Sequence, residues 1–182
     1  MNFAFVFPGQ GSQSVGMMAA YGDSAVIRET FAEASAALGE DLWQMVADGP
    51  AELLAQTVNT QPLMLTAGIA VYREWIARGG AVPALVAGHS LGEWTALVAA
   101  GALDFQDAVK LVRLRAQAMQ EAVPQGEGAM AALLGLDEAQ AVEACAEAAQ
   151  GEVVSAANLN SPGQIVIAGS RAAVERAIVA AK

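Results

Sequence analysis

Cysteine and histidine are almost absent from this chain of 182 residues, which contains one of each. The cysteine, Cys145, lies on an alanine-rich helical pattern with no histidine or second cysteine near it. We therefore expect a small core residue and neither a nucleophile nor a metal ligand. A single cysteine excludes a disulfide within the chain, which fits the reducing cytoplasm. The sequence predicts a cytoplasmic protein without a metal site.

Positive charge is also scarce, because nine Lys and Arg residues stand against 19 Asp and Glu residues, for a formal net charge of −10. A strongly acidic chain is a poor partner for phosphate backbones, and no basic tract indicates a membrane surface. We therefore expect neither nucleic acid nor a membrane as a partner. No stretch is long and apolar enough to span a bilayer. The apolar start at 3–7 has no basic leader and indicates a buried strand, not a signal peptide.

Apolar residues are plentiful, since 55% of the chain is hydrophobic and only 15% is charged, which argues against disorder. Buried strands are expected at 3–7 and 84–87. Helical patterns cover 24–38, 50–56, 61–77, a segment from the turn at 88–92 to Gly101, and a segment from an N-cap at Asp104 to about 123. This alternation predicts an α/β subdomain with helical crossovers.

The pattern changes after a linker at 124–128. A strand is expected at 129–136, a helix at 137–149, strands at 153–158 and 164–168, and a helix from 171. Asp137 and Gln140 have the spacing of a capping box. The order β-α-β-β-α lacks one strand of a ferredoxin-like unit. We therefore expect two subdomains, residues 1–125 and 126–182, in the front part of a longer protein.

The strongest motif is Gly-His-Ser-Leu-Gly at 88–92, which matches the G-x-S-x-G nucleophile elbow between a strand and a helix. The turn is so sharp that Ser90 is strained, and the flanking glycines let neighbouring elements approach. The hydroxyl then stands at a helix N-terminus, where N–H groups and the helix dipole favour an oxyanion. The alternative is a glycine-flanked turn with an incidental serine. We interpret Ser90 as a nucleophile because both flanking elements are present.

His89 directly precedes Ser90, so the two side chains should point to different sides of the strand end. We interpret His89 as a packed or hydrogen-bonded support for the turn. A serine nucleophile needs a base within hydrogen-bond reach. No second histidine exists, so the base is missing from this sequence or an atypical group replaces it.

A glycine-rich loop at 9–16 follows the first strand. Ser14 stands where a dinucleotide-binding G-x-G-x-x-G would have its last glycine, and the Gly-Lys-Ser/Thr of a P-loop is absent. The loop is either a flexible connection or a place where the backbone approaches another group closely. If the protein were a serine acyltransferase, a loop after a neighbouring strand would give the second oxyanion N–H, and Gln10 is placed to give it.

Arg115 has an unusual position on the helical wheel. At about 100° per residue it falls in the middle of an apolar arc with Ala108 and Met119, whereas Arg113 falls on the polar arc. A guanidinium cannot lose its proton, so burial requires an anionic partner. The spacing supports two readings equally: an internal salt bridge or snorkelling side chain, and a carboxylate-binding arginine that faces a substrate pocket.

Together these motifs resemble the malonyl-CoA:acyl carrier protein transacylases, acyltransferases of fatty-acid and polyketide synthesis. The resemblance covers essentially the whole chain in order. It rests on Phe-Pro-Gly-Gln-Gly-Ser-Gln at 7–13, Gly-His-Ser-Leu-Gly-Glu at 88–93, Arg115 with Met-Gln at 119–120, and Asn-Ser-Pro-Gly-Gln at 160–164.

The resemblance implies a hydrolase-like parallel sheet flanked by helices, with an inserted ferredoxin-like α+β subdomain, both incomplete at the C-terminal end. It implies that Ser90 is the nucleophile, that the backbone N–H groups of Gln10 and Leu91 form the oxyanion hole, and that Arg115 binds the malonate carboxylate. No cofactor is implied, because malonyl-CoA and the phosphopantetheine thiol of acyl carrier protein are substrates. The family's catalytic histidine would follow Lys182.

Two other functions stay open. A serine esterase or thioesterase would use the same elbow, although it has no need of the Arg115 cation. The second alternative is a non-catalytic binding or scaffold fragment that keeps the fold but lacks the catalytic base. Arg171, Arg176 and Lys182 form a modest basic group that would suit an acidic carrier protein or simply belong to a solvated helix face.

Overall fold

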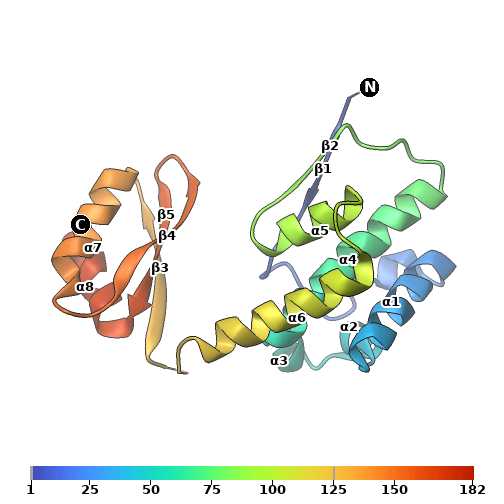
Figure 1. The fold of residues 1–182 in the computed structure, drawn as a ribbon, viewed down its shortest axis with the longest axis horizontal. Helices are drawn as coiled ribbons and strands as arrows, with labels where there is room; N and C mark the ends of the chain where they lie inside the picture. The colour runs from blue at the N-terminus through green and yellow to red at the C-terminus, as the bar shows by residue number, and fades with distance from the viewer. Residues whose placement is uncertain (1, 125) are drawn as a thin grey trace. The chain divides into compact units, whose positions relative to one another are not determined.

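The computed structural model describes residues 2–124 and 126–182, which form two compact units (Figure 1). The large unit ends at Gln120, and the small unit runs from Glu121 to Lys182. The predicted boundary after residue 125 involves a residue outside the described ones.

The large unit is built on two parallel strands, β1 (Ala4–Phe7) and β2 (Leu85–Gly88), whose register pairs Phe7 with Gly88. Helix α4 packs against both α1 and α5, and α5 packs against both strands (Figure 1). The α/β prediction with a parallel sheet is confirmed. The helices are α1 (Ala25–Leu38), α2 (Leu42–Asp48), α3 (Ala51–Leu54), α4 (Thr57–Ala77), α5 (Leu91–Ala99) and α6 (Phe105–Glu121), with a 3-10 turn at Ala19–Tyr21.

The strands are not buried on both faces, which corrects the prediction. Phe5 and Phe7 contact the ring of Tyr72 on α4, and Phe7 is only 5% exposed. Successive side chains of a strand point to opposite faces, so Val6 on β1 lies on the face opposite Phe5 and Phe7. Val6 and Leu85 on β2 are 74% and 71% exposed. Within the described residues, the helices therefore cover one face of this sheet.

The start of α1 is joined to the end of α4 through Glu74. Ser24 caps α1 by accepting a hydrogen bond from the Ile27 N–H, and its hydroxyl donates to Glu74 Oε2 at 2.7 Å. Arg78 Nε donates to Glu74 Oε1, also at 2.7 Å. The Ser24 hydroxyl and then Arg78 lower the pKa of the Glu74 carboxyl, because both stabilise its charged form.

Helix α4 begins at Thr57, one turn before the predicted start at 61. A start at 61 would have put Pro62 in the first turn, where its missing N–H costs nothing. Two side chains stabilise the additional turn: Asn59 donates to the Leu53 carbonyl and Thr60 to the Leu54 carbonyl. The interior proline is tolerated because these tertiary bonds offset its cost.

The small unit contains β3 (Gly128–Leu134), α7 (Glu138–Ala149), β4 (Val154–Ser161), β5 (Gln164–Ser170) and α8 (Arg171–Ala180). Its antiparallel sheet has the order β3-β5-β4. The predicted capping box is present, because Asp137 and Gln140 exchange hydrogen bonds. Cys145 is buried, and this burial raises the pKa of its thiol, so it is the core residue expected.

Candidate active site

The turn from β2 to α5 has the geometry of a nucleophile elbow. Ser90 has φ 53° and ψ −113°, a positive-φ conformation that is strained for a residue with a side chain. A Cβ on Gly88 would overlap the backbone of Gly92, and a Cβ on Gly92 would overlap the carbonyl oxygen of Phe7. Ser90 itself is exposed at the start of α5, so its hydroxyl does not point into the core.

The loop after β1 lies against this elbow. Because β1 and β2 are parallel, their carboxyl ends meet at the same edge of the sheet, and a Cβ on Gly9 would lie 3.4 Å from the His89 carbonyl oxygen. The Gln10 side chain donates to Thr57 Oγ1 at 3.0 Å. Among the described residues, neither the Gln10 nor the Leu91 backbone N–H donates to another backbone group outside the regular helices and strands. The two residues flank the edge of the sheet where Ser90 stands, one in the loop after β1 and the other directly after Ser90.

Arg115 comes to the same place from α6. Its Nη2 donates to Ser90 Oγ at 2.9 Å, and its Nη1 donates to Gln61 Oε1 at 2.7 Å. Within residues 2–124 and 126–182, no carboxylate forms an ion pair with Arg115. The half-buried guanidinium is thus held by neutral oxygens and keeps a net positive charge beside the hydroxyl.

The predicted helical wheel of α6 needs correction. Its buried residues are Phe105, Ala108, Val109, Val112 and Ala116. At about 100° per residue, Arg115 and Arg113 lie about 80° to either side of that face, so neither is at its centre. Met119, assigned to the apolar arc, is 50% exposed. The predicted arc was centred on all apolar residues of the helix, including residues such as Met119 that are exposed near Ser90.

Arg113 was expected in solvent, and this expectation is wrong. Its side chain is only 15% exposed and forms two hydrogen bonds with the Glu40 carboxylate, at 2.9 and 2.6 Å. Its Nε is buried without a hydrogen-bond partner in the described chain. The internal salt bridge considered for Arg115 therefore belongs to Arg113, on the opposite flank of the helix.

Sequence reasoning missed Gln61. This side chain lies near the start of α4, is completely buried and contacts both Arg115 and Met119. The sequence carries no signal of this burial, and the contacts follow in the structure because a buried amide must be hydrogen-bonded.

His89 does not act on Ser90 in this structure. The residue is exposed, and among the described residues its side chain forms no hydrogen bond with the Ser90 hydroxyl. Its backbone carbonyl accepts a hydrogen bond from the Gly92 N–H at 2.9 Å, which closes the turn. The described part of the chain thus brings the candidate nucleophile Ser90 beside the Arg115 cation, and among the described residues the side-chain contact of the Ser90 hydroxyl is with Arg115 and not with a base.

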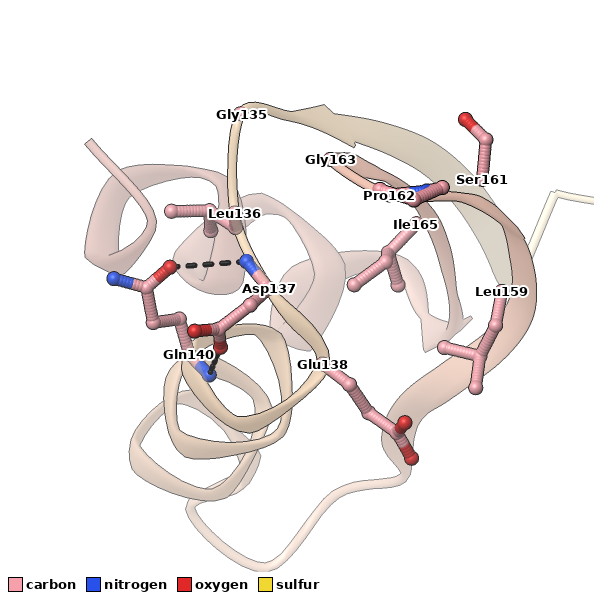
Figure 2. A pocket seen from close by; sticks show the side chains of 10 residues that line it. All are labelled: Gly135, Leu136, Asp137, Glu138, Gln140, Leu159, Ser161, Pro162, Gly163 and Ile165. Carbon is pink, nitrogen blue, oxygen red and sulfur yellow. Dashed lines mark hydrogen bonds between the residues drawn. The ribbon is translucent and has the colours of Figure 1, made fainter.

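The small unit contains an open pocket of about 550 Å³ between the start of α7 and the hairpin of β4 and β5 (Figure 2). Asp137 and Glu138 line it, and no lysine or arginine does. Figure 2 shows that Asp137 is used in the capping box of α7. Negative charge without a cation disfavours a carboxylated or phosphorylated ligand, so this pocket is not the candidate site.

The predicted basic group is largely engaged within the small unit. Arg176 donates to the carbonyl oxygens of Ala148 and Ala149 at the end of α7, and forms an ion pair with Glu152. Arg171 donates to the Gly126 carbonyl oxygen. Arg176 thus stabilises the end of α7, and Arg171 joins the start of α8 to the turn before β3.

Two features are absent from the described residues. No helix there combines the length and apolarity that a membrane crossing requires. No group of three or more His, Cys, Asp and Glu side chains in that part of the chain is arranged to hold a metal ion.

The similarity to known proteins covers nearly the whole chain. The acyl transferase domain model matches residues 4–182. The malonyl CoA-acyl carrier protein transacylase of Escherichia coli strain K12 is 62% identical over 181 residues, which are 99% of this chain and 59% of the relative. The chain thus spans about three-fifths of the length of the curated relatives that it matches.

Solved structures agree in fold. The acyl-carrier-protein S-malonyltransferase of Burkholderia pseudomallei 1710b is 62% identical, with a TM-score of 0.93 over 100% of this chain and 59% of the solved one. A malonyl-transacylase in complex with a type II PKS acyl-carrier protein is 54% identical, also with a TM-score of 0.93, over 100% and 59% of the two chains.

Proposed function

Because the chain belongs to the acyl transferase domain family, we propose that the full-length protein transfers a malonyl group from malonyl-CoA to the phosphopantetheine thiol of acyl carrier protein. The pathway would be fatty-acid biosynthesis in the cytoplasm. One observation carries the proposal: a guanidinium without a carboxylate partner in the described chain donates to the nucleophile candidate, Arg115 Nη2 to Ser90 Oγ, at 2.9 Å.

The first half-reaction forms an ester on Ser90. The hydroxyl oxygen attacks the thioester carbonyl, and the Gln10 and Leu91 N–H groups donate to the resulting oxyanion. The C–S bond then breaks, and coenzyme A leaves as its thiol with the proton that Ser90 gave up. A general base must carry this proton, and among the described residues the side chain that hydrogen-bonds to Ser90 Oγ is Arg115, which cannot accept it.

The second half-reaction reverses the first with a new thiol. The phosphopantetheine sulfur attacks the malonyl ester, and the tetrahedral oxyanion meets the same two N–H groups. The ester C–O bond then breaks, and the proton of the thiol passes to the Ser90 oxygen, which regenerates the hydroxyl. Acyl carrier protein as acceptor is supported by the solved relative that is bound to its carrier protein.

Arg115 gives the site its preference for a carboxylated acyl group. In a malonyl ester one methylene separates the carbonyl from the free carboxylate, so the carboxylate lies within reach of a cation that contacts the ester oxygen. An acetyl group would leave that guanidinium without an anion, and an unmatched polar group lowers reactivity. An ordinary esterase gains nothing from such a cation.

The test is intact-mass spectrometry of the full-length protein after mixing with malonyl-CoA. We expect one malonyl group per chain, lost on addition of pantetheine, and no adduct on Ser90→Ala. Malonyl bound covalently to Ser90→Ala would refute the nucleophile assignment. Rapid loss of the adduct to water, without acceleration by thiol, would favour a thioesterase instead.

A further inference from the structure

We infer that Gln61 is a positioning residue that holds the Arg115 guanidinium beside Ser90 and thereby sets the preference for a carboxylated acyl group. This inference rests on the proposed malonyl transfer. Gln61 is buried and contacts Arg115, whereas the Ser90 hydroxyl contacts Arg115 and not Gln61.

The contacts form a chain across the site. Met119 Sδ accepts from Gln61 Nε2 at 3.3 Å, Gln61 Oε1 accepts from Arg115 Nη1 at 2.7 Å, and Arg115 Nη2 donates to Ser90 Oγ at 2.9 Å. Gln61 is 0% exposed, whereas Met119 is half exposed. The amide thus joins three elements, because Gln61 lies on α4, Arg115 and Met119 on α6, and Ser90 at the start of α5.

The chemistry of the two side chains fixes the orientation of this contact. A guanidinium only donates hydrogen bonds, so the carbonyl oxygen of Gln61 must face Arg115 and the amide nitrogen must face away. The sulfur of Met119 then accepts from that nitrogen. With both ends of the amide engaged, one nitrogen of the guanidinium is fixed and the other is directed at Ser90.

Neutrality is the second property that matters. A glutamate in place of Gln61 would also accept from Arg115, but it would pair the charge and weaken attraction for a substrate carboxylate. A glutamine orients the cation without neutralising it. This residue type therefore suits a site that must keep its positive charge for a substrate.

The experiment compares kcat/KM for malonyl-CoA and acetyl-CoA in the full-length protein, wild type and Gln61→Met. Methionine keeps the length of the side chain and removes the acceptor. We expect the malonyl-to-acetyl ratio to fall about 10- to 100-fold, the effect of losing a hydrogen bond to a charged group. A residue that only supports folding would lower both values together and leave the ratio unchanged.

Two further variants keep the inference testable if Gln61→Met folds poorly. Gln61→Glu retains the shape and the bond to Arg115, and we expect its malonyl KM to rise because the charge is paired. In an Arg115→Ala background, Gln61→Met should change the ratio no further. A wild-type ratio in Gln61→Glu, or additive losses in the double variant, would overturn the inference.

Thr66→Val is the matched control. Thr66 is also 0% exposed on α4, but its hydroxyl donates to the Pro62 carbonyl and does not contact Arg115. Its ratio should equal that of the wild type, and a fall would mean that the assay reports general damage to α4. If the wild-type protein forms no malonyl adduct, the proposed function fails. If the adduct forms but the Gln61 variants keep the wild-type malonyl-to-acetyl ratio, only this inference fails.

Discussion

Replacement of Arg115 by methionine removes the cation and leaves an unbranched side chain of comparable length. In the structure the guanidinium donates to Ser90 Oγ and Gln61 Oε1, and no described carboxylate neutralises it. Truncating one partner of a buried charge pair costs about 2–5 kcal/mol. Arg115 is only half-buried, which favours the lower part of that range. We therefore expect a loss of about 2–3 kcal/mol, or about 30- to 150-fold, in kcat/KM for malonyl-CoA.

The assay is steady-state transfer to pantetheine by the full-length protein, with malonyl-CoA and acetyl-CoA measured in parallel. Arg113→Met is the matched control, because that residue lies on the same helix but pairs with Glu40. The control should lower the melting temperature and leave the malonyl-to-acetyl ratio as it is in the wild type. Our reasoning is refuted if Arg115→Met keeps the wild-type ratio, or if Arg113→Met lowers it equally.

Two other changes test the fold around the site. Gly92→Ala would bring a methyl group into overlap with the Phe7 carbonyl oxygen. We therefore expect the free energy of unfolding in urea to fall by about 1–3 kcal/mol and the malonylation of Ser90 to slow. Wild-type stability would contradict the close packing of the elbow. Glu74 has a lowered pKa in the folded protein, so its contribution is complete above the ordinary carboxyl pKa and is lost as the pH falls through the lowered value. Glu74→Gln should therefore lower the melting temperature more at pH 7 than at pH 3, and an equal loss at both would contradict the role of its charge.

The elbow could be predicted from sequence because its cause is local. A strand, a sharp turn and a helix follow one another within a few residues, and only glycine fits at 88 and 92, where added carbon would meet backbone. The strained φ of Ser90 follows from the same geometry. The capping box of Asp137 and Gln140 is local in the same sense.

The long-range features could not be predicted in this way. A helical wheel shows which residues share a face of the helix, but not which residues of other elements contact that face. The ion pair between Arg113 and Glu40 therefore could not be predicted. The same limit leaves two readings for Arg115 from the sequence, and the structure adds that it contacts Ser90 and Gln61 and forms no ion pair within the described residues. The early start of α4 depends on carbonyl groups of the preceding helix, which sequence periodicity does not report.

Exposure was misjudged for a related reason. An apolar strand indicates burial on both faces, yet Val6 and Leu85 are largely exposed because the described helices cover one face of the sheet. Short α2 was missed because seven residues give too little periodicity, although Asp41 caps it as an N-cap residue should.

The central claim is that Ser90 accepts an acyl group under the direction of the Arg115 cation. Its most direct test exposes full-length protein briefly to an equimolar mixture of malonyl-CoA and acetyl-CoA and maps the modified peptide by tandem mass spectrometry. We predict that malonyl on Ser90 is the dominant adduct. Equal amounts of acetyl and malonyl on Ser90, or a malonyl group on a different residue, would contradict the account.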